Sequence, residues 1–175
     1  MNSKVVICEE GLEEYPRSTV IAGNLIMLVW IALGTVACYF FNPVAAWIFL
    51  AVALLLVFVV LRKLVCTNCY YYGKWCATGW GKLSALMFKK GNIETFNDSV
   101  GVKLAPAIYG LLTLLPLVLG TISAVQHFSV AKPIVLAALL LLGFYSGTLG
   151  RRKSCAQCKM RRYCIGSAVK SVQEQ

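Results

Sequence analysis

Six of the eight cysteines stand in two short boxes about ninety residues apart, and they are the residues most able to do chemistry. The first box contains Cys66, Cys69 and Cys76, and the second contains Cys155, Cys158 and Cys164. Two thiolates separated by two residues can face one ion from a single turn of chain, and a second pair completes a tetrahedron with Zn–S distances near 2.3 Å. We therefore predict that these six cysteines are metal ligands.

Several chemistries fit the two boxes, and the sequence leaves them open. The two C-x-x-C pairs could hold one zinc ion, or all six thiolates could hold two bridged zinc ions. Each box could instead bind an iron–sulfur cluster with one ligand from elsewhere, such as Cys8. Without a metal, a C-x-x-C dithiol flanked by Lys and Arg has a stabilised thiolate and can be redox active. Zinc is the favoured cofactor and an iron–sulfur cluster the second choice, because repeated C-x-x-C pairs in a reducing compartment favour metal or redox chemistry over structural disulfides.

The boxes belong to a longer pattern that occurs twice. Pro16 and Pro43 recur as Pro106 and Pro133 at an offset of 90. The first cysteines of the two boxes are 89 residues apart. Such a fixed period indicates a duplicated structural unit. We predict an N-terminal tail over 1–17, a first repeat over 18–90, a linker over 91–103 and a second repeat over 104–175.

Each repeat contains two apolar stretches that are expected to form membrane-spanning helices. Between Ser18 and Leu61 there are 44 residues without a charged side chain, about twice the roughly 20 that one crossing requires. Asn42 and Pro43 interrupt this run and indicate the start of a second helix, because Asn is a good N-cap and Pro is favoured at the first helical position. The expected helices cover Val20–Phe41, Val44–Leu61, Leu104–Val125 and Ile134–Leu149. The last is short, so we expect it to cross upright or to thin the bilayer locally.

The distribution of basic residues predicts the orientation of these helices. Of the 17 Lys and Arg residues, 16 lie in the segments 1–17, 62–103 and 151–175, and only Lys132 lies in a turn at the opposite end. Because basic residues in short loops remain on the cytoplasmic side, both termini and both boxes are expected to be cytoplasmic. The fold class is therefore an all-α, multi-pass protein of the cell membrane, with four helices arranged as two parallel hairpin repeats. A pseudo-two-fold axis along the membrane normal would bring the boxes together.

The net charge of +10 indicates contact with anionic lipid headgroups at that face, rather than with nucleic acid. After the first box, Trp80, Leu83 and Met87 lie on one face of a helical projection, which predicts an amphipathic helix in the membrane interface. This helix would cover the membrane surface or dock a soluble partner. The acidic residues near the N-terminus are expected to form a solvated tail.

An enzyme is not indicated, because the sequence contains no nucleophile–base arrangement, phosphate loop or paired carboxylates, and the four expected helices contain no Asp, Glu, Lys, Arg or His. We expect a small scaffold or accessory subunit of a larger membrane complex, with other membrane or cytoplasmic subunits as partners, in which the metal site joins the two halves. One alternative is a membrane thiol–disulfide or electron-transfer protein that uses the C-x-x-C pairs. Another is a soft-metal transporter with Cys38 inside the membrane as a way-station.

Overall fold

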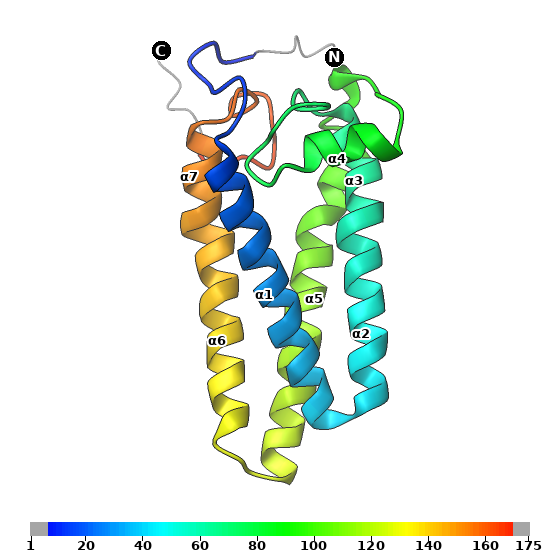
Figure 1. The fold of residues 1–175 in the computed structure, drawn as a ribbon, viewed down its shortest axis with the longest axis vertical. Coiled ribbons are helices and arrows are strands. Elements are labelled where there is room, and N and C mark those ends of the chain that lie inside the picture. The colour runs from blue at the N-terminus through cyan, green and yellow to red at the C-terminus, as the bar shows by residue number, and fades with distance from the viewer. Residues whose placement is uncertain (1–6, 170–175) are drawn as a thin grey trace.

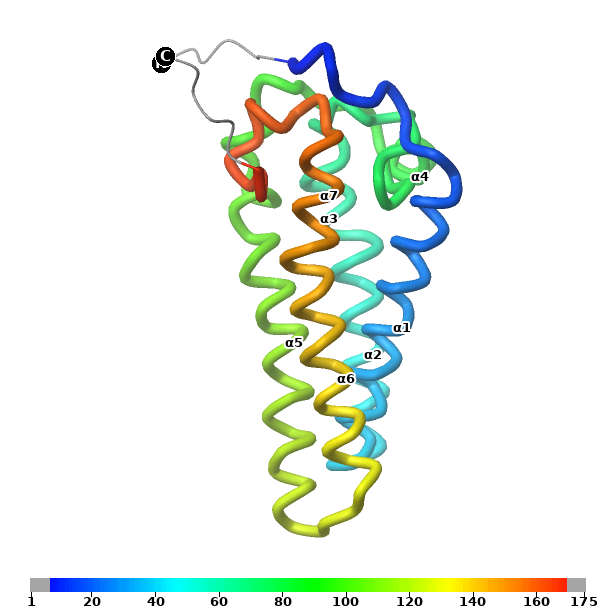
Figure 2. Tube along the Cα trace, turned by 90° about the vertical axis from the view of Figure 1, so that its left-hand side faces the viewer, coloured from blue at the N-terminus to red at the C-terminus, as the bar shows by residue number. Residues whose placement is uncertain are grey.

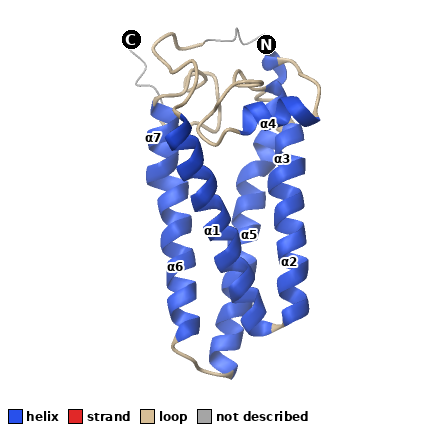
Figure 3. Ribbon diagram, in the orientation of Figure 1, coloured by secondary structure: helices blue, strands red, loops and turns tan. Residues whose placement is uncertain are grey.

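The computed structural model describes residues 7–169, and this part of the chain is all-helical with no β-strand (Figures 1 and 3). The helices are α1 (Arg17–Phe41), α2 (Pro43–Leu55), α3 (Leu61–Leu64), α4 (Trp80–Met87), α5 (Val100–Gln126), α6 (Ala131–Tyr145) and α7 (Arg151–Ala156). Short π-helical segments join α2 to α3 and α6 to α7. The all-α class predicted from the sequence is confirmed.

Four continuous helical segments are long and apolar enough to cross a membrane. They cover Arg17–Phe41, Pro43–Asn68, Val100–Gln126 and Ala131–Ala156. The boundary between the first two lies where the sequence predicts it, since the Asn42 side chain accepts a hydrogen bond from the Val44 amide at 2.7 Å and Pro43 is the first helical residue. The prediction of four helices long and apolar enough to span a membrane is confirmed, and it is consistent with a multi-pass membrane protein.

The fourth predicted helix is longer than expected. It was predicted to end at Leu149, but the helical segment continues through Arg151, Arg152 and Lys153 to Ala156. Charge alone does not stop a helix, because Arg and Lys are good helix formers. The chain passes through Gly147 and Gly150 in a π-helical turn and then continues as α7. The short length on which the expectation of an upright or bilayer-thinning helix rested is therefore wrong, because the segment has 26 residues.

The two π-helical segments lie at matching places in the chain. The first covers Leu56–Val60 and the second covers Ser146–Gly150, so that they are 90 residues apart and each precedes a cysteine box. A π-helical turn accommodates one extra residue in a helix and changes the direction in which later side chains point. Each box thus follows a helix that contains a π-helical turn at the same place in the repeat.

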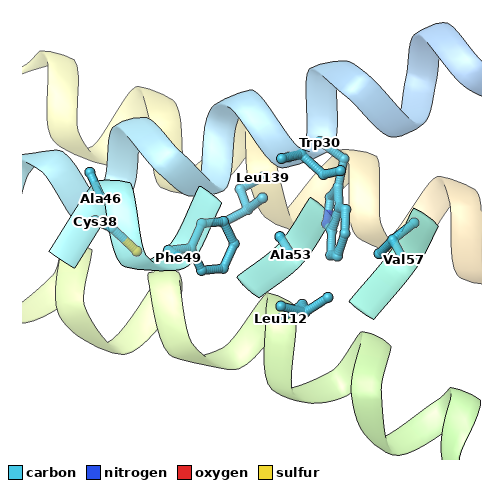
Figure 4. Close-up of a cluster of buried hydrophobic side chains, with 9 residues drawn as sticks. Trp30, Cys38, Ala46, Phe49, Ala53, Val57, Leu112 and Leu139 are labelled. Atoms are coloured by element: carbon cyan, nitrogen blue, oxygen red, sulfur yellow. The ribbon is translucent and has the colours of Figure 1, made fainter. Parts of the chain in front are cut away.

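Of the four long helices, α1 is the central one, because it contacts α2, α5 and α6. In addition, α5 packs on α6. Their core is a column of apolar side chains that includes Trp30, Phe49, Val57, Leu112 and Leu139 (Figure 4). The two hairpins pack differently. The second helix of the second hairpin, α6, contacts the first helix of the other hairpin, α1. In the first hairpin it is α3, and not α2, that makes the equivalent contact with α5.

The loops are concentrated at one end of the helix bundle. The N-terminal segment, the connection between α3 and α5, and the chain after α7 all lie at this end, and the two short turns lie at the other (Figures 1 and 2). We call this loop end the head, and define it as residues 7–16, 65–99 and 157–169. It contains Cys8 and five of the six box cysteines, and Cys155 lies just before it in α7.

Candidate functional site

Both C-x-x-C pairs lie within a single turn of chain at the end of a helix. Cys66 begins a 3-10 turn directly after α3, and the Cys69 amide donates a hydrogen bond to the Cys66 carbonyl at 3.3 Å. In the second box, Cys155 lies in the last turn of α7, and the Cys158 amide donates to the Cys155 carbonyl at 3.1 Å. The two pairs therefore share one local geometry, in which the backbone turns back after the first cysteine.

The third cysteines of the boxes have different surroundings. The Cys76 sulfur accepts a hydrogen bond from the Trp80 amide at 3.2 Å, at the point where α4 begins. Gly79, which lies between them, has a φ of +70°, a conformation that favours glycine. The Cys164 amide donates to the Met160 carbonyl at 2.8 Å, in a turn that no helix follows as far as residue 169, where the described part of the chain ends. Cys76 thus supports the start of a helix, and Cys164 does not.

The two boxes contact each other through the residue that lies two places after the second cysteine of each box. This residue is Tyr71 in the first box and Met160 in the second, and each is 2% exposed. The Met160 sulfur lies 3.4 Å from the Cys69 sulfur and accepts a hydrogen bond from the Tyr70 amide at 3.2 Å. In the opposite direction, the Tyr71 hydroxyl accepts a hydrogen bond from the Lys159 amide at 3.1 Å. Each box therefore inserts a buried side chain into the other.

The N-terminal segment lies across both boxes and connects them (Figure 2). It pairs with the second box, since the Cys8 amide donates to the Lys159 carbonyl and the Leu12 amide to the Gln157 carbonyl, both at 2.9 Å. The Leu12 carbonyl accepts a hydrogen bond from the Tyr71 hydroxyl of the first box at 2.6 Å.

Tyr15 extends this connection towards the helices. Its hydroxyl donates to the Ser154 carbonyl in α7 at 2.7 Å, and its amide donates to the Trp75 carbonyl within the first box at 2.8 Å. Its ring also packs edge-on against the buried ring of Tyr71. The chain from Cys8 to Tyr15 is thus hydrogen-bonded to both halves of the head.

Two acidic residues of this segment stay exposed, as the expectation of a solvated tail requires, but they form ion pairs that attach the segment to both boxes. Glu13 pairs with Lys74 at 2.9 Å and also with Lys159, and Glu10 pairs with Arg161 at 2.7 Å. Hydrogen bonds from Lys159, Lys74 and the Tyr70 hydroxyl lower the pKa of Glu13 to about 2. The sequence lacked a signal for this arrangement, because the acids and their basic partners are separated by more than 50 residues.

Burial disfavours the thiolate form of the cysteines in the head. It raises the pKa of the Cys69 thiol well above its usual value, and nearby Cys66, Cys76 and Cys158 would oppose a negative charge there. Burial also raises the pKa of Cys158 to about 11 and that of Cys164 above its ordinary value. Thiols in such surroundings are poor nucleophiles, and a bound metal ion is one agent that can deprotonate them.

One basic residue beside the first box is fully buried. Arg62 is 1% exposed, and its guanidinium lies 4.6 Å from the ring centre of Phe58 and 4.3 Å from that of Trp80. Its Nε and Nη1 atoms have no hydrogen-bond partner in the part of the chain that the structure describes. The sequence identified Arg62 only as a flanking charge, whereas the structure uses it to join α3 to α4.

The donor types fit the predicted metal, but the side chains are not assembled around one point. Within residues 7–169, no three Cys, His, Asp or Glu side chains lie close enough together to hold a metal ion. The structure brings the two boxes into contact and places Cys69, Cys76 and Cys158 around one buried cluster of Tyr15, Val20 and Tyr71. A shared site would therefore require rotation of thiols that are already neighbours.

Sequence reasoning identified the six cysteines but missed the residues that connect them. Tyr71 and Met160 occupy matching positions in the repeat, at the same offset of 89 as the cysteines before them. This alignment was a usable signal, although Tyr and Met share no chemistry that would have drawn attention to it. Comparison of the chain with protein-family models, with curated proteins and with solved structures finds no match.

Proposed function

We propose that this protein is a small membrane scaffold or accessory subunit of a larger membrane assembly, in which a cysteine-ligated metal site joins its two halves. The observation that carries the proposal is the reciprocal contact between the boxes, in which Met160 lies against Cys69 and Tyr71 against the backbone of Lys159. Two cysteine boxes that are separated by two membrane crossings are thereby held in one layer. On the spacing of the cysteines alone, zinc is the first candidate and an iron–sulfur cluster the second.

The duplicated architecture is part of this proposal. It is supported by the two π-helical segments at an offset of 90 and by the equivalent backbone turns at the C-x-x-C pairs. The unequal packing of α2 and α6 shows that any symmetry between the halves is approximate. Two parallel hairpins related in this way place their boxes at the same end of the bundle.

The cytoplasmic orientation of the head is likewise a proposal, supported by the 16 basic residues that are assigned to that end of the molecule. The head also presents apolar side chains outward from α4, where Leu86 is 81% exposed and Met87 is 52% exposed. Such a surface suits the headgroup layer of the bilayer or another subunit. We propose lipid and membrane or cytoplasmic protein subunits, and no nucleic acid, as the partners.

The contrasting function is a thiol oxidoreductase that uses the C-x-x-C pairs. It requires thiolates stabilised by nearby positive charge, but Lys74 and Lys159 are paired with Glu13 and Arg161 is paired with Glu10. Burial moreover raises the pKa of Cys69 and Cys158. These features favour a structural or metal-binding role over redox exchange. The soft-metal transporter gains little support, because Cys38 is fully buried within the apolar core (Figure 4).

The experiment that tests this proposal is a metal and absorption analysis of the purified full-length protein, followed by thermal unfolding with and without a strong chelator. Zinc is colourless, whereas an iron–sulfur cluster absorbs broadly on the order of 400 nm. Because a structural metal contributes folding free energy, its removal should lower the melting temperature. A protein that contains no metal and melts identically in the chelator would contradict the proposal and favour the oxidoreductase.

A further inference from the structure

The contact between Cys69 and Met160 brings two soft donor atoms from opposite halves of the molecule together in a buried place. Their sulfur atoms lie 3.4 Å apart although the residues are 91 positions apart in the chain, and Met160 is 2% exposed. Two ligands that each lie 2.3 Å from one tetrahedral ion are separated by roughly 3.8 Å. Little movement of either side chain would therefore be needed for both sulfurs to bind one ion.

A third sulfur lies in the same layer. Cys69 and Cys158 both pack against the buried cluster of Tyr15, Val20 and Tyr71. Cys158 precedes Met160 by two residues, and the Cys158 carbonyl accepts a hydrogen bond from the Arg161 amide at 3.1 Å, so that the turn carrying both side chains is held in place. Two thiols and one thioether thus lie in one layer of the head, in which the Cys69 and Met160 sulfurs are in contact and both cysteines are half-buried.

The thioether distinguishes between metals. Zinc in proteins is bound by Cys, His, Asp and Glu, and a neutral methionine sulfur is not among its usual ligands. Mixed sets of cysteine and methionine sulfurs instead favour the soft monovalent ion Cu(I). The chemistry of the side chains at this contact therefore differs from the chemistry that cysteine spacing alone predicts.

We propose that Cys69, Cys158 and Met160 form a binding site for a soft monovalent metal ion of the Cu(I) class, at the contact between the two boxes. The inference rests on the proposed function, because it takes from it a metal site that joins the two halves. It differs in the metal, which is Cu(I) rather than zinc or an iron–sulfur cluster. Binding replaces the thiol protons of Cys69 and Cys158 with the ion and releases these protons to solvent. The thioether of Met160 binds without loss of a proton.

The test is a titration of the reduced full-length protein in detergent, without oxygen, with Cu(I) against a colorimetric Cu(I) chelator and separately with Zn(II) against a colorimetric zinc chelator. The variant is Met160→Leu, which removes the sulfur and keeps an apolar side chain of similar size. Its matched control is Met87→Leu, because Met87 lies in α4 of the same head and is 52% exposed. We expect Met160→Leu to weaken Cu(I) binding at least about tenfold, the lower end of the loss caused by removing even an outer-shell partner of a ligand. Met87→Leu should bind Cu(I) as the parent does.

The outcomes separate this inference from the proposed function. If the parent binds zinc but not Cu(I), or if Met160→Leu binds Cu(I) as tightly as the parent, the inference is overturned and a cysteine-only metal site stands. If the parent binds neither metal, the inference is overturned, and the proposed function keeps only the iron–sulfur cluster as its metal group. Should Met160→Leu fail to fold, selenomethionine can replace the four methionines, and X-ray absorption at the selenium edge of the Cu(I)-loaded protein then decides. A copper neighbour around selenium supports the inference, and its absence rejects it.

Discussion

At the scale of single residues, the most informative side chains are those that lie between the cysteines. Tyr71 illustrates this, because its hydroxyl donates to the Leu12 carbonyl and accepts from the Lys159 amide while its ring is 2% exposed. One hydroxyl therefore links the N-terminal segment, the first box and the second box. The repeat aligns Tyr71 with Met160, but it does not give the partners of the Tyr71 hydroxyl, because these lie in other parts of the chain.

Replacing Tyr71 by Phe should destabilise the protein by about 1–3 kcal/mol, because it leaves a buried amide and a buried carbonyl without their partner. The measurement is thermal or denaturant unfolding of the variant beside the parent. Tyr145→Phe is the control, since Tyr145 is 46% exposed and lies in α6 away from the head. Equal stability of Tyr71→Phe and the parent would show that this hydroxyl does not hold the boxes together.

The ion pairs of Glu13 should make stability depend on pH in the acid range. The pKa of Glu13 is lowered from 4.5 to about 2, so its contribution is fully present above about pH 4.5 and is lost as the pH falls towards 2. The melting temperature of Glu13→Gln should therefore lie below that of the parent at pH 6, with the difference shrinking between pH 4.5 and pH 2. Glu14→Gln, at an exposed neighbouring acid, serves as the control. A difference that is constant over this range would refute the role of the Glu13 carboxylate.

At the scale of elements, the sequence predicted what depends on composition and local order. The four helices, the Asn42 cap and the short helix after the first box were all predicted, because uncharged runs, capping residues and helical spacing are local signals. The π-helical segments and the extension of the last helix to Ala156 were not predicted. Residue preferences do not encode the π-helical turns, and the two glycines of Ser146–Gly150 oppose the continuation of the helix into α7.

The connection between α3 and α4 depends on a stacked guanidinium. Arg62→Lys should lower stability by about 1–2 kcal/mol, because a compact ammonium cannot stack on the rings of Phe58 and Trp80 as a planar guanidinium does. Arg152→Lys is the matched control, since it is the same substitution at an exposed position of α7. Comparing the melting temperatures of both variants with the parent tests the prediction, and equal losses at the two positions would contradict it.

At the scale of the whole molecule, the structure has a bundle of four helices that are long and apolar enough to span a membrane. Both C-x-x-C pairs lie at one end of this bundle, within the head or directly beside it (Figure 1). The sequence predicted that the boxes would meet, from the parity of the crossings and the period of the repeat. It did not predict the interlocking of Tyr71 and Met160 or the N-terminal segment across them. Those contacts depend on the relative rotation of the hairpins, which a repeat pattern leaves undetermined.

The orientation of this bundle can be tested by adding one cysteine at either end and comparing the labelling of each variant with that of the parent, which has eight cysteines of its own. The two variants are Lys90→Cys and Phe128→Cys. Lys90 is exposed in the head, and Phe128 is 79% exposed in the turn after α5. Because basic residues remain cytoplasmic, an impermeant thiol reagent applied to intact cells should label position 128 and not position 90. Both should react once the membrane is permeabilised. Labelling of position 90 in intact cells would reverse the proposed orientation.

The most direct test of the central claim, that one metal site is shared by the two halves, is the metal content per chain of Cys69→Ser and Cys158→Ser beside the parent. A shared site needs ligands from both boxes, so each replacement alone should remove all of the metal that the parent carries and lower the melting temperature with it. Cys38→Ala, a change in the apolar core away from the head, should leave the metal in place. If each serine variant instead keeps about half of the parent's metal, the boxes bind separately, and the account of a joint site is contradicted.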